Sequence, residues 1–79
     1  MATIRNEIRR LRFENGEMTQ QELAEKIKLT RQTVNAIELV KYSPSLEAAF
    51  RIAAVFGKSI ESVFHYAEDP QSDGAGEAI

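Results

Sequence analysis

The stretch TQQELAEKIKLTRQTVNAIE, residues 19–38, predicts two short helices joined by a tight turn. Thr19 and Glu22 have the spacing of a capping box, in which each side chain accepts a hydrogen bond from the backbone N–H of the other residue. Thr30 is placed to cap the second helix. Apolar residues recur at helical spacing at Leu23, Ala24, Ile27, Val34 and Ile37. This is the spacing of a helix-turn-helix unit, although an ordinary pair of crossed helices would share it.

A helix is also expected before this unit. Over residues 3–15, Ile4, Ile8 and Leu11 fall on one apolar stripe. Gly16 follows at the position that favours a left-handed backbone, which ends the helix.

The second half of the chain predicts two further helices. Pro44 disfavours helical geometry at the residue before it, and Ser45 then caps a helix over residues 46–56. Gly57 ends that helix, and Ser59 caps a last short one. The apolar positions expected to face the core are Leu46, Ala49, Phe50, Ala53, Phe56, Ile60, Val63 and Phe64. No alternating apolar and polar run is long enough for a strand, so the expected fold is all-α, a compact five-helix bundle.

The composition is that of one small soluble domain. The 79 residues are 43% hydrophobic and 28% charged, and they include no cysteine that could form a disulfide or a thiolate zinc site. The charged beginning MATIRNEIRRLRFENG lacks the apolar core of a secretion signal. The most apolar segment, LEAAFRIAAVFG, is too short to span a membrane. A cytoplasmic protein is expected.

Charge is divided unevenly along the chain. Residues 1–66 hold all ten basic residues and eight acidic ones, whereas residues 67–79 hold four acids and no base. The expected folded domain, residues 1–66, is therefore mildly basic, which permits a nucleic-acid partner without requiring one. Residues 67–79, AEDPQSDGAGEAI, are polar and rich in Gly and Pro, and are expected to form an acidic, disordered tail.

The exposed face of the helix that begins at Arg31 has an unusual composition. A helix face without a task is usually filled by Glu, Lys and Ala, yet this one offers Arg31, Gln32, Thr33 and Asn35. Arg can pair with guanine, Gln or Asn with adenine, and a Thr methyl group can contact the thymine methyl group. The four residues lie near the end of the helix that enters the major groove in helix-turn-helix docking. We expect them to read base edges, against the alternative of a merely solvated helix face.

Other polar residues are placed to contact the DNA backbone. The amide of Gln20 and the backbone N–H groups at the start of its helix can donate to a phosphate. Lys41 and Tyr42, which follow the second helix of the unit, are placed to hold the same backbone. Thr30 is expected to be an N-cap first and a phosphate contact second, and Lys28 offers a further cation in the turn.

Residues 5–66 as a whole resemble the Cro/C1-type (XRE) helix-turn-helix regulators, in particular compact single-domain bacterial ones. The specific segments are TQQELAEK, TRQTVNAIE, KYSPSLEAAFRIA and SIESVF. The resemblance implies a lambda-repressor-like five-helix bundle that commonly binds DNA as a dimer. It also implies a structural ion pair between Arg12 and Glu38. Positions that match the family's phosphate-contacting glutamine and its base-reading residues are Gln20, Arg31, Gln32 and Asn35.

Two positions depart from the family pattern. The family often has glycine where this chain has Lys28, in the turn, and where it has Val40, after the second helix of the unit. A left-handed backbone costs a residue other than glycine about 1 kcal/mol or more, and it is least favourable for a β-branched side chain. Lys28 is expected to adopt that conformation, whereas a rearranged helix exit is expected at Val40.

The segment VFHY, residues 63–66, has two interpretations. Phe64 and Tyr66 can close the helical bundle, or they can form a short extended segment or apolar patch that serves dimerisation. A homodimer would suit DNA binding, because a two-fold dimer places two recognition helices about 34 Å apart on a palindromic operator.

These observations favour a sequence-specific regulator of transcription that binds double-stranded DNA, most simply a repressor that occludes a promoter. One alternative is the antitoxin of a toxin–antitoxin pair, and another is a protein-interaction module that has lost DNA binding. No nucleophile–base pair or phosphate loop is present and His65 stands alone, so no enzyme, metal, cofactor or small-molecule ligand is expected. Arg5, Arg9 and Arg10 are expected to form a solvated face.

Overall fold

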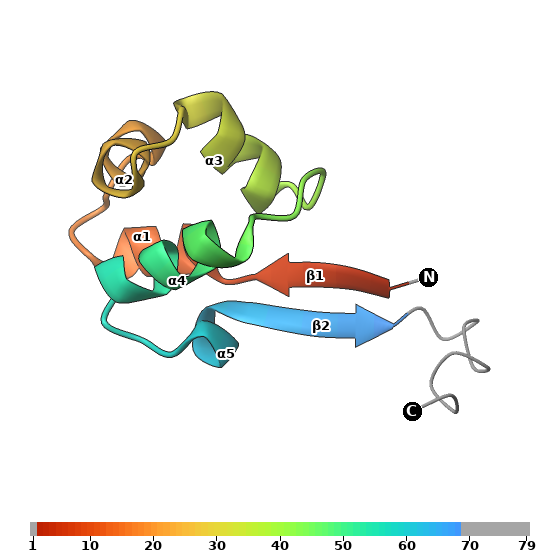
Figure 1. Ribbon diagram of the computed structural model, residues 1–79. Helices are drawn as coiled ribbons and strands as arrows, with labels where there is room; N and C mark the ends of the chain where they lie inside the picture. Colours follow the sequence, from red (N-terminus) through yellow and green to blue (C-terminus); the bar gives the residue numbers. More distant parts are fainter. Residues whose placement is uncertain (1, 69–79) are drawn as a thin grey trace.

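The computed structural model describes residues 2–68 of the chain. Its elements, in chain order, are β1 (Ala2–Asn6), α1 (Ile8–Glu14), α2 (Gln20–Ile27), α3 (Arg31–Glu38), α4 (Leu46–Val55), α5 (Ile60–Val63) and β2 (Phe64–Glu68). In this part of the chain, five helices form the body, and two strands pair as an antiparallel sheet that extends away from them (Figure 1). The expected five-helix fold is confirmed, and the sheet is a small addition to it.

Side chains cap the helix starts where the sequence predicts them. The Thr19 hydroxyl accepts a hydrogen bond from the backbone N–H of Glu22 at 3.0 Å, and the Glu22 carboxylate accepts one from the backbone N–H of Thr19 at 2.8 Å. Thr30, Ser45 and Ser59 cap α3, α4 and α5 in turn. Each cap satisfies a backbone N–H that has no partner within the helix, so these helices begin at defined residues.

Two helix ends have a left-handed backbone at a residue other than glycine. Lys28 (φ 62°) ends α2, as expected, and Val40 (φ 61°) follows α3. The backbone N–H of Lys41 donates to the carbonyl of Ala36 at 2.9 Å, which is the long hydrogen bond of a Schellman motif. The prediction that the exit of α3 is rearranged at Val40 is therefore wrong. The helix exit keeps the geometry that glycine favours, and a β-branched residue bears the strain.

The core is one cluster of apolar side chains from all the helices. Its buried members are Ile8, Leu11, Leu23, Ala24, Ile27, Val34, Ile37, Ile52, Ala53, Phe56 and Val63. Leu46 and Phe50 were expected in the core, but 70% and 57% of their surfaces are exposed. Helix α4 is apolar on more than one side, and it turns Ala48 and Ile52 inward instead.

The N-terminal segment differs from the helix expected over residues 3–15. Residues 2–6 form β1, and α1 begins only at Ile8. In the sheet, Ile4 pairs with Tyr66, so Ile4 does not extend the apolar stripe of α1. The spacing of Ile4 and Ile8 fits a helix equally well, which is why the strand was not expected.

Asn6 connects the sheet to the helical body. Its Nδ2 donates to the carbonyl of Ile37 in α3 at 2.9 Å, and its Oδ1 accepts from the backbone N–H of Ile8 at 3.2 Å. Nearby, the backbone N–H of Glu7 donates to the carbonyl of Val63 at 2.9 Å. These bonds fix the sheet relative to α1, α3 and α5.

The VFHY segment is mostly strand. Phe64 and Tyr66 belong to β2, and Ala67 and Glu68 continue that strand, so the folded part extends past residue 66. The rest of the expected disordered tail, residues 69–79, lies outside the described residues. None of the helices within residues 2–68 is long and apolar enough to cross a membrane.

Candidate nucleic-acid interface

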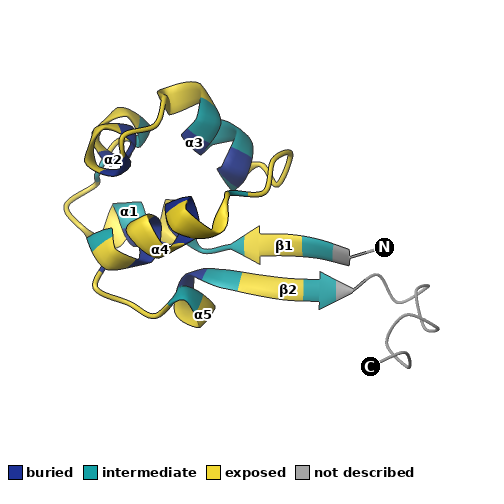
Figure 2. Ribbon diagram, viewed as in Figure 1, coloured by how far each residue is buried: buried dark blue, intermediate teal, exposed yellow. Residues whose placement is uncertain are grey.

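The outward side of α3 carries the residues expected to read bases. Arg31 and Gln32 are exposed at its N-terminal turn, while Thr33 and Asn35 are half-buried. Figure 2 shows the beginning of α3 exposed and its end turned into the body of the protein. The helix is thus anchored on one side and accessible on the other.

A nearly buried ion pair lies beneath this face. Arg12 Nε donates to Glu38 Oε2 at 2.7 Å, and Arg12 Nη2 donates to Glu38 Oε1 at 3.0 Å. The remaining Nη1 donates to the carbonyl of Met18 at 2.7 Å. Only 14% of the Arg12 side chain and 7% of the Glu38 side chain are exposed. This two-bond fork joins α1 to the last turn of α3 and fixes the direction of the Glu38 carboxylate.

Gln20 connects the ion pair to a candidate base-reading residue. Its Nε2 donates to Asn35 Oδ1 at 3.0 Å and to Glu38 Oε1 at 3.1 Å. The structure therefore brings Gln20, Asn35 and Glu38 together from α2 and α3. Both amide hydrogens of Gln20 are used, so in this arrangement its side chain has no hydrogen left to donate to a phosphate.

Thr30 and Thr33 are hydrogen-bonded to each other at the start of α3. Thr30 Oγ1 accepts from the backbone N–H of Thr33 at 3.1 Å, and the two hydroxyl oxygens lie 2.9 Å apart. Thr30 is thus held as the N-cap of α3, with the Thr33 side chain against it.

The remaining candidate phosphate contacts are exposed but separated. Lys41 and Tyr42 line a hollow of about 380 Å³ beside the sheet, together with Ile4 and Tyr66. Lys28 ends α2 at the opposite end from Gln20, where Lys26, Arg51, Ala54 and Val55 line another hollow with it.

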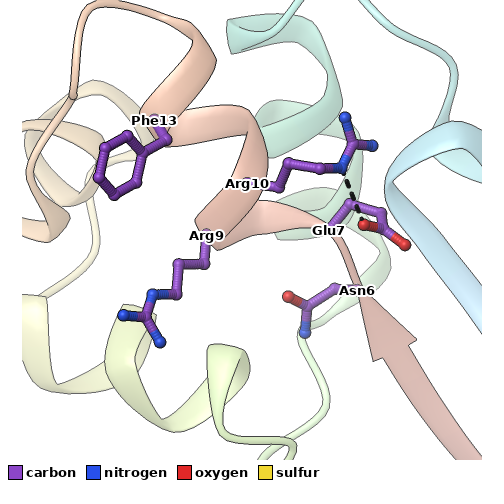
Figure 3. Close-up of a pocket in the computed structure, with 5 residues that line it drawn as sticks. All are labelled: Asn6, Glu7, Arg9, Arg10 and Phe13. Carbon is purple, nitrogen blue, oxygen red and sulfur yellow. Dashed lines mark hydrogen bonds and ion pairs between the residues drawn. The ribbon is translucent and has the colours of Figure 1, made fainter.

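Arg9 of α1 is a candidate site residue that the sequence analysis missed. It lines a hollow of about 320 Å³ with Gln20, Asn35 and Glu38. Figure 3 shows Arg9 extending away from Arg10, and a dashed line there marks the ion pair between Arg10 and Glu7. Arg9 forms no hydrogen bond or ion pair with any described residue, so its charge is available to a ligand. Its position three residues before Arg12, on the same side of a helix, could have indicated this.

Two carboxylates, the half-buried Glu7 and the exposed Glu22, have pKa values below the ordinary range. The hydrogen bond from Arg10 is the main cause of the lowered pKa of Glu7, and the same contact raises the pKa of Arg10. The hydrogen bond from the Thr19 backbone N–H is the main cause of the lowered pKa of Glu22. Within residues 2–68, no three His, Cys, Asp or Glu side chains gather as metal ligands would.

Comparison with known proteins identifies the family. Residues 8–63 match the family model described as helix-turn-helix. An uncharacterized HTH-type transcriptional regulator of Methanocaldococcus jannaschii is 52% identical over 52 residues, which is 66% of this chain and 79% of the relative. Another, of Methanothermobacter thermautotrophicus, is 49% identical over 67 residues, 84% of this chain and 96% of the relative.

A bacterial relative shows the same likeness. The uncharacterized HTH-type transcriptional regulator YgzD of Bacillus subtilis is 39% identical over 66 residues, which is 84% of this chain and 98% of the relative. The family match, over residues 8–63, spans α1 to α5. The chain belongs to the Cro/C1-type (XRE) family of helix-turn-helix transcriptional regulators, whose members bind DNA and are not enzymes.

Proposed function

We propose that this protein is a sequence-specific, cytoplasmic regulator that reads the major groove with α3, most simply a repressor that occludes a promoter. The observation that carries the proposal is the outward side of α3. Arg31 and Gln32 are exposed there, and Asn35 lines an open hollow. These side chains can pair with base edges, while the opposite side of the helix is held in the core.

Contacts to the DNA backbone would orient α3 in the groove. The donors come from several elements: the backbone N–H groups at the start of α2, Arg9 on α1, and Lys41 and Tyr42 after α3. Thr30 and Lys28, at the two ends of the turn between α2 and α3, are secondary candidates. Each phosphate neutralised by a cation releases counterions, so binding should weaken steeply as salt rises.

The proposal includes a homodimer on a palindromic operator. One α3 helix can read only a few base pairs, whereas two copies related by a two-fold axis read two half-sites. The sheet offers a candidate surface for the second copy. Ile4 and Tyr66 are cross-strand partners with 38% and 67% of their surfaces exposed.

The test is selection of bound sites from random double-stranded DNA, followed by the same selection with Arg31→Ala. This variant should lose about 1–3 kcal/mol of binding free energy at the selected site and relax the preference at one base position. Arg5→Ala, which removes an exposed arginine from β1, is the matched control and should leave every base preference unchanged. Equal weakening of selected and random DNA by Arg31→Ala would contradict its base-reading role.

A further inference from the structure

The Glu38 carboxylate fixes which way the Gln20 amide points. An ionised carboxylate can only accept hydrogen bonds, and Arg12 holds this one in place through two of them. Gln20 approaches Glu38 Oε1 with its donor nitrogen at 3.1 Å. The flipped amide would set the carbonyl oxygen of Gln20 against a carboxylate oxygen, with no hydrogen between them. The inward end of the Gln20 amide is therefore its nitrogen.

The orientation of Asn35 follows from that of Gln20. The same Gln20 nitrogen lies 3.0 Å from Asn35 Oδ1. Because an amide nitrogen only donates, the Asn35 atom that faces it must be the oxygen. Through these two hydrogen bonds, the position of the Glu38 carboxylate determines the orientation of the Asn35 amide on the outward side of α3.

Two polar atoms remain for a ligand. Asn35 Nδ2 and Gln20 Oε1 form no hydrogen bond with described residues. In the described part of the chain, no buried side-chain nitrogen or oxygen of a half-buried residue lacks a partner. Since both residues are half-buried, these two atoms must contact solvent. Both residues line the hollow of about 320 Å³. The hollow therefore offers a donor from α3 and an acceptor from α2.

The donor of Asn35 and the acceptor of Gln20 fit some base edges and not others. In the major groove adenine presents an acceptor, N7, beside a donor, the N6 amino group, whereas guanine presents two acceptors. A donor from Asn35 and an acceptor from Gln20 complement adenine. Guanine would place its O6 against Gln20 Oε1, and two acceptors would then meet.

We propose that the Arg12–Glu38 ion pair, acting through Gln20, orients Asn35 so that Asn35 and Gln20 together select adenine at one base position. The inference rests on the proposed function, and it names the base that this part of the site reads. Asn35 and Gln20 contact the base, while Arg12 and Glu38 are positioning residues.

The experiment selects bound sites from random double-stranded DNA with the 79-residue chain and with its variants, and compares the base preferences of each. The wild type should enrich adenine at a position that becomes unselective with Asn35→Ala. Gln20→Met keeps the length of the side chain without its polar atoms, and should lower the preference for adenine at that same position about tenfold. Gln20→Ala, which shortens the side chain, should relax the preference for adenine at the same base position. Gln21→Met, from the same turn, is the control. Among the described residues the Gln21 side chain hydrogen-bonds only to Glu25, so this variant should leave all base preferences unchanged.

Several results would overturn the inference. If Gln20→Met weakened all sequences alike and kept the adenine preference, Gln20 would not contact the base. Enrichment of guanine, or of no base, at the Asn35 position would also exclude it. A wild type that enriches no sequence would remove the proposed function and this inference together, whereas an enriched site unaffected by both Gln20 variants would remove only this inference. The thermal midpoint of each variant shows whether it is folded.

Discussion

The α2–α3 face and the β1–β2 sheet are built in opposite ways. At the α2–α3 face, polar side chains are fixed by a nearly buried ion pair and by caps a few residues away. The sheet joins the two ends of the described chain, and its cross-strand partners Ile4 and Tyr66 remain partly exposed. The difference indicates that rigidity is concentrated where side chains would meet DNA, whereas the sheet tolerates change more readily.

Removal of one partner of the buried ion pair should have the largest effect. Arg12→Ala leaves the Glu38 carboxylate nearly buried without its cation, which should lower the free energy of unfolding by about 3–5 kcal/mol. Arg10→Ala is the control, because its pairs with Glu7 and Glu14 are exposed and should contribute no more than about 1 kcal/mol. Urea unfolding measures both. Equal losses would mean that the α2–α3 face is no more rigidly held than the surface.

Two isoleucines of the same sequence stripe test the contrast between the core and the sheet. Ile8→Ala removes a fully buried side chain and should cost about 2–5 kcal/mol in the free energy of unfolding. Ile4→Ala removes a strand side chain that is 38% exposed, so it should cost about 1 kcal/mol. The same urea titration applies. A cost at Ile4 as large as at Ile8 would show that the sheet is as strongly coupled to the core as α1.

The two left-handed helix exits provide a smaller, stabilising effect. Val40→Gly should raise the free energy of unfolding by about 1 kcal/mol, because glycine adopts a φ of 61° without strain. Lys28→Gly should gain less, since its side chain is unbranched. Thermal midpoints measured side by side provide the test. A loss of stability in Val40→Gly would mean that the contacts of the valine side chain outweigh the strain of its backbone.

The smallest effect concerns pH. The folded pKa of Glu22 lies below its ordinary value of 4.5, so its capping contribution is fully present above that value and is lost as pH falls through the folded pKa. Below about pH 4.5, stability should therefore fall less steeply with acidification in Glu22→Gln than in the wild type. Chemical unfolding at a series of pH values measures the two slopes. Identical slopes would exclude a stabilising contribution from the ionised Glu22 carboxylate.

The helices could be predicted because their signals are local. Thr19, Thr30, Ser45 and Ser59 each lie within three residues of the N–H group that they cap. Strand β1 could not be predicted, because its partner lies at the other end of the described chain. Periodicity also could not place Phe50, since α4 offers a second apolar side with smaller residues that pack closer to the core.

The same distinction applies to the candidate site. The residue types on α3 predict base reading without reference to the fold, because Thr33 and Asn35 are mediocre helix formers and Arg31 and Gln32 can pair with base edges. The contact between Gln20 and Asn35 joins residues 15 positions apart on different helices, so it depends on how α2 and α3 cross. The place of Arg9 beside that contact depends likewise on how α1 packs beneath α3.

The pairing of β1 with β2 also bears on how the chain assembles during its synthesis. Strand β1 leaves the ribosome before β2, which is made only after the helices α1 to α5 between them. Closing the longest loop is entropically the most costly step, whereas α2 and α3 are neighbours that can meet early. We therefore expect α2 and α3 to pair before β1 and β2 are joined, with the sheet as the last element to close.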